Sequence, residues 1–503
     1  MLNVSAFIKQ MRKDAKREAP VFCCGDISMI GREEEIKILE ALLYSNRPEF
    51  LALYGRRRVG KTYLVREFFN NTFSFYATGV QKGDRKQQLR AFKEALVKYG
   101  DENKTIPKDW FEAFSRLEAL LGKEEIVRDF RSNKRIVFLD ELPWMDTAKS
   151  DFKSAFDHFW NTFGSAEKDL LLIICGSATS WIINNIVKDT GGFYNRLTRQ
   201  MRLMPFTLRE CEQLLQSNGV HYTRKQIVES YMVFGGVPYY LNYLDPGKSL
   251  AQNIDLLFFR ENSPLKYEFG QMFHALFHNS DKYLNIIREL SGKKSGLTRK
   301  ELIESGKVSD GKELTKCLED LEQCGFIRKY HDFSTRAKSV HFQLIDPMCL
   351  FYLAFIENGK VGSWMDHINT SAYYAWCGLS FEKVCLLHIE QIKQRLGIAG
   401  VSSNELSWSS KKTKPGAQID LLIDRKDDII NICEMKFSEE MFIIDANYEE
   451  SLIHKVETFR KETGTRKALW LTMITFSGVA NNEHKHIVIN ELTADDLFAI
   501  YTG

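Results

Sequence analysis

The stretch from Leu51 to Thr62, LALYGRRRVGKT, is the feature that most constrains the fold of this chain. A short apolar run leads into a glycine-rich loop with the spacing G-x-x-x-x-G-K-T, and a helix-like segment follows. The glycines allow backbone turns that point amide N–H groups inward, and the helix N-terminus adds the positive end of its dipole. The sequence therefore predicts a strand, loop and helix that together bind the phosphates of a nucleotide.

The residue types in this loop assign roles to individual side chains. Lys61 is expected to reach the β- and γ-phosphates, and the Thr62 hydroxyl is expected to bind Mg²⁺. The rest of the predicted cradle consists of Gly55, Arg56, Arg57, Arg58, Val59, Gly60 and Tyr63. A glycine-rich turn that carries Lys-Thr by chance is the alternative, and the flanking strand and helix patterns argue against it. ATP and Mg²⁺ are the predicted cofactors.

Length and composition set broad limits on the remainder. The 503 residues are enough for about three domains, and 44% hydrophobic with 27% charged residues is typical of soluble globular proteins. No apolar run reaches the roughly 18 residues of a membrane span, and no apolar segment follows the basic N-terminus as in a secretory signal. Ten cysteines without a C-x-x-C pair indicate buried thiols in a reducing cytoplasm. Because the net charge is only +3, contacts with DNA require local basic patches.

Apolar segments alternate with longer helical patterns in the first half of the chain. This alternation predicts a parallel sheet with helices on both faces. The strand candidates are Phe50–Tyr54, Phe73–Ala77, Arg135–Asp140 and Leu170–Cys175. Helical patterns follow from about Pro205.

A second module is predicted from about residue 280 to 345. Helical patterns cover Tyr283–Leu290 and Leu314–Cys324, and between them Thr298 and Glu301 form a capping box that opens another helix. A β-hairpin follows over residues 326–330 and 340–344. Three helices and a hairpin in this order predict a winged helix. Its Arg299 and Lys300 are candidates for contacts with backbone phosphate, and such modules also serve as protein–protein contacts.

Acidic residues follow the predicted strand that ends at Asp140. Asp140 is expected to hold Mg²⁺ through water, and Glu141 to orient and polarise an attacking water. The next strand ends beside Ser177, which is a candidate to sense the γ-phosphate. Arg196 and Arg199 are each either an arginine finger, in their own or a neighbour's site, or an ordinary surface arginine.

Together these motifs resemble the prokaryotic "archaeal ATPase" family of the AAA+ superfamily, near the origin-recognition and signal-transduction ATPases. The resemblance covers roughly residues 25 to 360 and rests on Ile30-Gly31-Arg32-Glu33, Gly55–Thr62, Asp140-Glu141, Gly176-Ser177 and Gly235–Tyr240. It implies that Ile30, Gly31 and Pro238 line the adenine. The lid shows no obvious sensor-two arginine.

Two apolar strands flank a polar turn near the C-terminus, which predicts a β-hairpin. Glu434 and Lys436 are two residues apart and so share a face. If Arg425 pairs with Ile429, Asp420 stands opposite Glu434, and two facing carboxylates call for a cation such as Mg²⁺. Lys436 would then position or stabilise the water that attacks a phosphodiester.

This arrangement resembles the restriction-endonuclease-like, PD-(D/E)XK, nucleases over about residues 371 to 475. Their core is D-x13-E-x-K on a hairpin, preceded by a helical glutamate, and Glu382 fits that position. Chains that pair the archaeal-type ATPase with such a domain form a recognised arrangement. The basic Lys411, Lys412 and Lys414 are either a solvated loop or a phosphate track.

The sequence thus predicts an α/β chain with a P-loop AAA+ parallel sheet, a helical lid, a winged helix and a C-terminal restriction-endonuclease-like α/β domain. The predicted division is 1–25 N-terminal extension, 26–205 ATPase core, 206–270 lid, 271–350 winged helix, 351–370 linker and 371–503 nuclease-like domain. The leading hypothesis is a protein that binds and hydrolyses ATP and acts on DNA, with its ATP state controlling a Mg²⁺-dependent nuclease-like domain. The alternative is a signalling or assembly switch whose C-terminal domain binds without cleaving. A third is an ATPase whose contact with DNA is incidental. A homo-oligomer is compatible with each.

Overall fold

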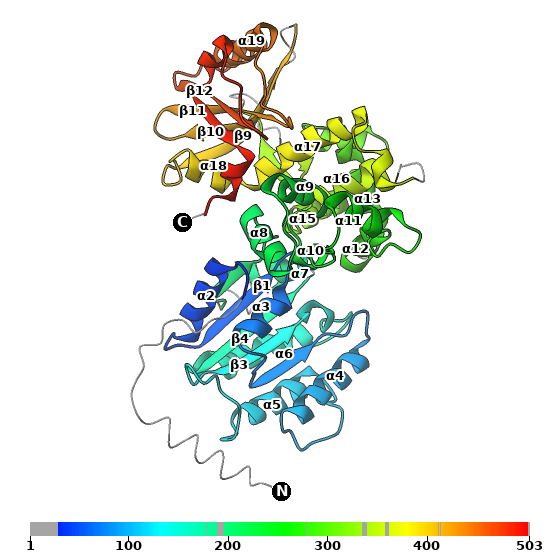
Figure 1. The fold of residues 1–503 in the computed structure, drawn as a ribbon. Coiled ribbons are helices and arrows are strands. Elements are labelled where there is room, and N and C mark those ends of the chain that lie inside the picture. Colours follow the sequence, from blue (N-terminus) through cyan, green and yellow to red (C-terminus); the bar gives the residue numbers. More distant parts are fainter. Residues whose placement is uncertain are drawn as a thin grey trace, which may run out of the picture.

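The structure is a computed structural model that describes residues 29–177, 179–188, 196–277, 279–333, 340–357, 362–410, 412 and 414–500. The predicted extension 1–25 and Lys411 lie outside these residues. A layered α/β unit lies at one end of the molecule, a second sheet at the other, and helices occupy the space between them (Figure 1). The N-terminal half of the chain builds the first unit, and the second sheet follows the helices.

Five parallel strands form the first sheet in the order β2-β3-β4-β1-β5. Their bounds are β1 Glu49–Tyr54, β2 Phe75–Thr78, β3 Arg135–Asp140, β4 Leu170–Gly176 and β5 Arg199–Arg202. The four predicted strands are confirmed, although β2 begins two residues later than expected. The edge strand β5 was not predicted, because its sequence Arg-Gln-Met-Arg has a single apolar residue.

Helices cover both faces of this sheet. They are α2 Glu33–Leu43, α3 Lys61–Phe68, α4 Arg85–Lys98, α5 Trp110–Leu121, α6 Phe152–Thr162 and the short α7 Thr179–Ile182. Along β1, Phe50 and Ala52 enter one apolar core while Leu51 and Leu53 enter the other. Successive side chains of a strand point to opposite faces, so a strand buried on both faces is apolar throughout.

The middle of the chain is helical up to a small sheet. The helices of the lid region are α8 Leu208–Ser217, α9 Arg224–Phe234, α10 Pro238–Leu241, α11 Leu250–Ile254 and α12 Glu268–Leu276. The winged-helix region comprises α13 Ser280–Ser291, β6 Leu297–Thr298, α14 Arg299–Glu304, α15 Lys312–Gln323, β7 Ile327–His331 and β8 Val340–Leu344. The predicted helices and hairpin are confirmed, and the Thr298 capping box is present. The two-residue β6 adds a third strand in the order β6-β8-β7.

The described residues of the segment 351–370, expected to be a linker, instead contribute to a core. The helix α16 Pro347–Phe351 leads into this segment, and Phe351, Phe355 and Trp364 are all buried. Phe355 and Trp364 pack edge to face with ring centroids 5.1 Å apart. The prediction was wrong because Phe351, Phe355 and Trp364 belong to one continuous core with the lid, the winged helix and the following helix.

The second sheet has the order β13-β12-β11-β10-β9, antiparallel over β9, β10 and β11 and parallel from β11 to β13. Its elements are α17 Ser371–Leu387, α18 Ile389–Arg395, β9 Ser403–Ser410, β10 Ala417–Arg425, β11 Ile429–Lys436, α19 Ala446–Thr463, β12 Ala468–Thr475 and β13 Asn490–Thr493. The helix expected over 378–395 is two helices that meet at His388. Its ring Nδ1 lies 2.8 Å from the Val384 carbonyl, and its Nε2 accepts from the Leu208 N–H of the lid.

Candidate functional site

The glycine-rich loop joins the carboxyl end of β1 to the start of α3, as predicted. Gly55 and Gly60 have φ values of +145° and +95°, and Arg58 has +71°. A Cβ at Gly55 would stand 2.3 Å from the Leu203 carbonyl oxygen, so the close approach of β5 requires glycine there. The loop therefore has the positive-φ geometry that directs backbone N–H groups toward a ligand.

Lys61, Thr62 and Asp140 meet at the carboxyl edge of this sheet. The Lys61 ammonium donates to the carbonyls of Gly55 and Arg56, both at 2.9 Å. The Thr62 hydroxyl donates to an Asp140 oxygen at 2.9 Å. Hydroxyl and carboxylate oxygens are ligands that Mg²⁺ prefers, so this pair fits the ion predicted at the site.

Glu141 follows Asp140 in a left-handed conformation with φ +46°, which turns its side chain toward the end of β4. One Glu141 oxygen accepts from the Ser177 N–H at 3.1 Å and from the Ser177 hydroxyl at 3.0 Å. The candidate water-orienting group and the candidate sensor are thus in direct contact. Both hydrogen bonds use the same oxygen of Glu141, so Ser177 fixes the orientation of this carboxylate.

Arg56, predicted only as part of the phosphate cradle, points away into the rest of the molecule. Its guanidinium forms an ion pair with Asp346, the residue that caps α16, and both side chains are almost fully buried. It also lies over the Phe326 ring and 3.5 Å from the Met272 sulfur. Burial, the largest single effect, would lower the pKa of Arg56, but Asp346 together with Tyr240 and Cys349 raises that pKa.

Arg58 makes a second contact from the loop to the lid. Its guanidinium pairs with Glu268 of α12 and lies over the Tyr239 ring at 4.2 Å. The Tyr240 hydroxyl donates to the same Glu268 carboxylate at 2.9 Å. Arg57, between the two, is partly exposed. Sequence reasoning did not predict these contacts, because nothing local to G-x-x-x-x-G-K-T indicates where its variable side chains point.

The segment Ile30-Gly31-Arg32 contacts the phosphate loop through Arg32. Arg32 donates to the Val59 carbonyl at 3.0 Å and to the Met204 carbonyl at 2.8 Å, and its guanidinium lies over Phe206. A Cβ at Gly31 would stand 2.6 Å from a Glu210 oxygen, so this segment packs closely on the lid helix α8. Arg32 was missed as a functional residue, although it directly follows the predicted glycine.

The residues predicted to line adenine stand at the junction of core and lid. Ile30 packs against the lid core, and Pro238 is the first residue of α10, in the turn that brings Tyr239 to Arg58. A groove of 970 Å³ opens beside this junction, lined by residues of the Ile30-Gly31-Arg32 segment, the loop, the lid, the winged helix and α18. The roles of Ile30, Gly31 and Pro238 in base binding stay predictions.

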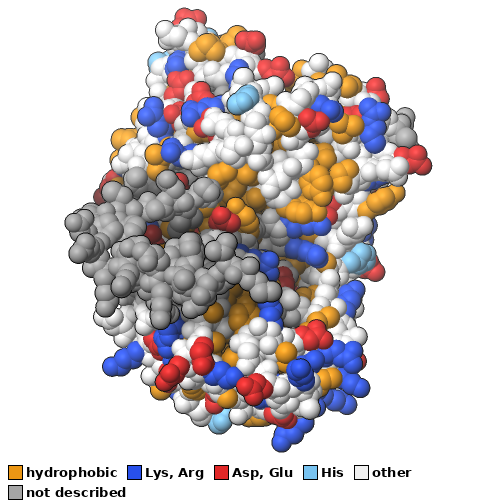
Figure 2. All heavy atoms as spheres, turned by 60° about the horizontal axis from the view of Figure 1, so that its bottom comes forward, with side chains coloured by type: hydrophobic (Ala, Val, Ile, Leu, Met, Phe, Trp, Pro, Cys, Tyr) orange, Lys and Arg blue, Asp and Glu red, His pale blue; other side chains and the backbone are white. Residues whose placement is uncertain are grey.

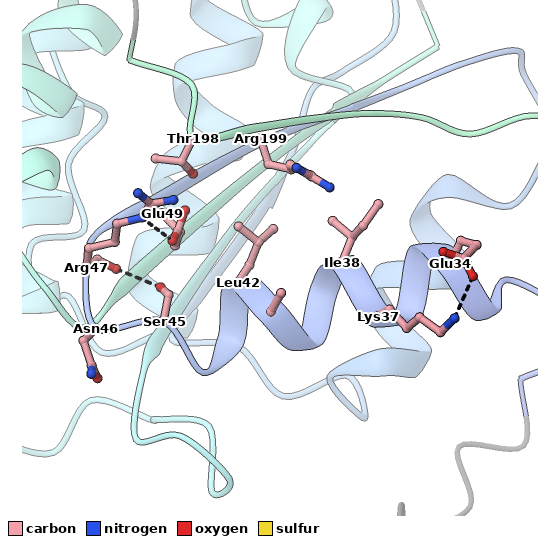
Figure 3. A pocket seen from close by; sticks show the side chains of 11 residues that line it. Glu34, Lys37, Ile38, Leu42, Ser45, Asn46, Arg47, Glu49, Thr198 and Arg199 are labelled. Carbon is pink, nitrogen blue, oxygen red and sulfur yellow. Dashed lines mark hydrogen bonds and ion pairs between the residues drawn. The ribbon is translucent and has the colours of Figure 1, made fainter. Parts of the chain in front are cut away.

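The two candidate fingers lie near the edge strand β5. Arg196 is exposed in the turn that precedes the strand, and Tyr63 of the loop is also exposed. Arg199 is the first residue of β5 and pairs with Leu51 near the middle of β1. It lines a groove of 690 Å³ between α2 and β5, where it lies above Ile38 and Leu42 (Figure 3). Arg199 therefore faces the α2 side of the core edge.

In the C-terminal unit, Glu382 and Asp420 are brought together by a lysine that was not predicted. The Lys294 ammonium lies 2.9 Å from a Glu382 oxygen and 3.0 Å from an Asp420 oxygen. Lys383 binds the other Glu382 oxygen at 2.7 Å. Burial alone would raise the pKa of Asp420, but Lys294 outweighs it and holds that pKa below its ordinary value. Lys294 is distant in sequence and carries no local signal.

Glu434 lies in different surroundings. The Tyr448 hydroxyl of α19 donates to it at 2.8 Å, and the ammonium groups of Lys436 and Lys455 pair with it. Burial, the largest single effect, would raise the pKa of Glu434, but Lys455, Lys436 and Tyr448 together hold that pKa below its ordinary value. Glu434 and Lys436 thus share a face, as predicted.

The hairpin has the predicted register but not the predicted pair of carboxylates at its end. The ladder runs from Asp424–Ile430 to Leu421–Cys433 and ends one residue before Asp420 and Glu434. A β-bulge between Ile419 and Leu422 shifts the pairing of β10 with β9 at this point. Asp420 then contacts Lys294 while Glu434 contacts α19. Among the described residues, no group of three His, Cys, Asp or Glu side chains is placed to hold a metal ion.

Arg299 and Lys300, the candidate contacts for nucleic-acid phosphate, each form an ion pair with an acidic side chain. Arg299 pairs with Asp310 at 2.6 Å and Lys300 with Glu304 at 3.7 Å. The exposed face of α15 carries Lys312, Glu313, Lys316 and Glu319. Basic and acidic side chains also alternate on the face shown in Figure 2. In this conformation no strongly basic stripe marks the described part of the winged helix.

Two further predictions from composition can be compared with the structure. The cysteines within the described ranges are free and buried: Cys175, Cys211, Cys317, Cys324, Cys349, Cys377, Cys385 and Cys433. No helix in the described part of the chain is both long and apolar enough to cross a bilayer. The buried-thiol prediction is confirmed for these eight residues.

Comparisons with known proteins agree with the loop and sheet. Residues 29–244 match a family described as an ATPase domain predominantly from Archaea. An uncharacterized protein of Methanocaldococcus jannaschii is 25% identical over 364 residues, 71% of this chain and 76% of that protein. An uncharacterized ATP-binding protein of the same organism is 43% identical over 47 residues, 9% of this chain and 80% of that protein.

Solved structures show weaker likenesses. A Walker-type ATPase of Pyrococcus abyssi has a TM-score of 0.46 and 18% identity, covering 65% of this chain and 97% of that one. The ORC2 protein of Aeropyrum pernix, in ADPNP and ADP complexes, has a TM-score of 0.40 and 12% identity, covering 67% and 95%.

Proposed function

We propose that this chain, whose residues 29–244 match the ATPase domain described as predominantly archaeal, hydrolyses ATP and transmits its nucleotide state to the lid and winged helix. The observation that carries the proposal is the convergence of Lys61, Thr62, Asp140 and Glu141 at one edge of the sheet. These are the groups that phosphoryl transfer requires for charge neutralisation and for positioning of water.

The contacts of Lys61, Thr62 and Glu141 indicate which groups would rearrange when ATP binds. Lys61 exchanges its two loop carbonyls for the β- and γ-phosphates. Thr62 and Asp140 would hold Mg²⁺, which neutralises charge on the phosphates when bound. Glu141 leaves Ser177 to orient the attacking water, and Ser177 is then free to contact the γ-phosphate.

The nucleotide state would reach the lid and winged helix through side chains of the phosphate loop itself. Since Arg56 and Arg58 are fixed to Asp346 and Glu268, a change in loop backbone pulls on α16 and α12. Loss of the γ-phosphate on hydrolysis releases that change, as in other switches held by phosphate contacts.

Substitutions in the loop and at the strand end test the ATPase assignment. Lys61→Ala should abolish ATP binding in calorimetry, because the loop loses the cation that meets the phosphates. Glu141→Gln should keep ATP binding and slow turnover by about 100-fold or more, because general-base assistance is lost. Glu94→Gln, an exposed residue of α4, is the matched control and should turn over like the parent. Turnover of Glu141→Gln at the parental rate would refute the role of Glu141.

A second candidate function belongs to the C-terminal unit. We infer that residues 371–503 form a PD-(D/E)XK-like domain that acts on DNA under control of the ATP state. The supporting observation is that Glu382 of α17 and Asp420 of β10 bind one cation between them, as a helix and a hairpin of that type would require. In the described conformation that cation is an ammonium group, so the carboxylates do not fit a divalent ion and no cleavage step follows from it.

An assay on supercoiled plasmid with Mg²⁺ or Mn²⁺ separates cleavage from binding. Loss of nicking in Glu434→Ala or Lys436→Ala supports a nuclease. DNA binding without nicking under either metal supports the non-cleaving signalling or assembly switch. Equal affinity for DNA with and without ATP would make the DNA contact incidental to the ATPase.

We also propose that the chain works in the cytoplasm and forms a homo-oligomer in which Arg196 or Arg199 reaches a neighbouring site. The exposure of both residues at the β5 edge supports this. Mass measurements with and without ATP, on the parent and on Arg199→Ala, test the assembly. An unchanged monomer in every condition would refute it.

A further inference from the structure

The turn that carries Lys294 lies between α13 and β6 and is held on several sides. Its Gly296 has φ +72°, and a Cβ there would stand 2.3 Å from the Phe342 carbonyl oxygen. The Lys294 carbonyl accepts from Lys383 at 3.3 Å and from the Gln343 side-chain amide. The Tyr330 hydroxyl donates to the next carbonyl, that of Ser295. The backbone of this winged-helix turn is therefore fixed against both its own sheet and the C-terminal helix α17.

The Lys294 side chain continues from this turn into the acidic cluster. Its ammonium is within 3.0 Å of both carboxylates, while the Glu382 side chain is 2% exposed and that of Asp420 18%. Burial alone would lower the pKa of Lys294, but the charges of Asp420 and Glu382 outweigh it and raise that pKa. The ammonium therefore stays charged and occupies the space between the two carboxylates.

A divalent cation and this ammonium are mutually exclusive. Both need the same oxygens of Glu382 and Asp420, and their like charges repel at such short range. Lys383 already neutralises part of Glu382. The carboxylates that a PD-(D/E)XK-like domain would use for a metal are thus satisfied by lysines.

We propose that Lys294 is an autoinhibitory contact, through which the winged helix keeps divalent cations away from Glu382 and Asp420. Withdrawal of the turn between α13 and β6 then opens the acidic cluster. This inference rests on the PD-(D/E)XK-like candidate described above, and it concerns cation access rather than cleavage.

The same strand end joins this contact to the nucleotide site. Gln343, which holds the Lys294 carbonyl, is three residues before Asp346, which holds Arg56 of the phosphate loop. The contacts therefore run without a gap from the loop through the end of β8 to the acidic cluster. A change of the loop on ATP binding acts directly on the segment that anchors Lys294.

Titration of nucleotide-free full-length protein with Mn²⁺, followed by electron paramagnetic resonance, tests the proposal. Lys294→Met keeps the length of the side chain and removes its charge, and it should bind Mn²⁺ at least about tenfold more tightly than the parent. Lys293→Met changes the neighbouring exposed lysine and should bind like the parent. Adding Asp420→Asn to Lys294→Met should remove the gain, which locates it at this cluster.

Equal Mn²⁺ affinity in the parent and in Lys294→Met, including no binding by either, would overturn the proposal. So would a gain that survives Asp420→Asn or that Lys293→Met reproduces. The ATPase rate of Lys294→Met reports separately on the ATPase domain and should be parental. Absence of plasmid nicking would reject cleavage while leaving the Mn²⁺ result valid.

Discussion

The buried ion pair between Arg56 and Asp346 allows a quantitative test of how the phosphate loop is fixed to the second half of the chain. The Arg56 and Asp346 side chains are 3% and 1% exposed. Removing one partner of such a pair costs roughly 3–5 kcal/mol, because the other charge is left buried without compensation. The Cys349 N–H and Arg56 bind different oxygens of Asp346, so Asp346→Asn keeps an acceptor for one of them only. Because one of the two hydrogen bonds is kept, we take the lower end, about 3 kcal/mol.

Amide hydrogen exchange of residues 348–351, in the helix that Asp346 caps, measures this cost locally. A loss of about 3 kcal/mol corresponds to exchange faster by roughly two orders of magnitude if opening and closing are fast. The control Asp310→Asn breaks the ion pair with Arg299, in which Asp310 is 62% exposed. That pair is worth less than about 1 kcal/mol, so exchange in α16 should not change.

A double variant shows whether the penalty arises from the stranded charge. Arg56→Met combined with Asp346→Asn removes the uncompensated guanidinium and should recover most of the protection. An increase in exchange below about tenfold in Asp346→Asn, or no recovery in the double variant, would refute the reasoning.

Two further predictions concern the hinge histidine and the loop glycine. Burial lowers the pKa of His388 to about 4 from 6.5, so the folded state takes up its proton later than the unfolded state. Stability should be full above pH 6.5 and fall progressively toward pH 4, by at most about 3 kcal/mol. Glu229, whose pKa burial raises to about 7, acts in the opposite direction. The unfolding temperature at pH 5 relative to that at pH 7.5 should therefore be higher in His388→Gln than in the parent and in the exposed control His221→Gln, because only the contribution of His388 is removed, and an equal pH dependence in all three would contradict the assignment. Gly55→Ala should lower the unfolding temperature because its Cβ meets the Leu203 carbonyl, at a cost of about 2 kcal/mol or more. Gly378→Ala, in a helix where a Cβ meets nothing within 4 Å, should be neutral or stabilising by up to ~1 kcal/mol.

The features that were predictable from sequence are those encoded over short stretches. The loop from Gly55 to Thr62, the apolar strand before Asp140 and the Thr298 capping box each carry their signal within a few residues. The structure shows all three. The hairpin register near Asp420 was predictable for the same reason, because the turn fixes which residues face each other.

The remaining features depend on partners that are distant in sequence. Arg and Lys are residue types that usually lie at the surface. Arg56 is 290 positions from its partner Asp346, and Lys294 is 126 positions from its partner Asp420. The polar strand β5 forms because β1 offers a free edge, which its own sequence does not indicate. The break at His388 depends on the lid N–H that its ring accepts. Each of these features depends on tertiary contacts, which the residue pattern of a single segment does not encode.

The chain leaves the first sheet once, over the few residues between β5 and α8. Beyond that crossing, the lid, the winged helix, α17 and one face of the second sheet share a single apolar core, while the first sheet keeps two cores of its own. Because this core is shared, we expect the residues beyond 206 to move as one unit relative to the first sheet, and the pairs of Arg56 with Asp346 and Arg58 with Glu268 to limit that movement. Since α19 lies at the far end of the molecule from the first sheet, a small rotation about residues 203–207 would move it over a larger distance than the lid (Figure 1). The distance between a spectroscopic label on the first sheet and one on α19 should therefore change on ATP binding. The distance between two labels that both lie beyond residue 206 should not change.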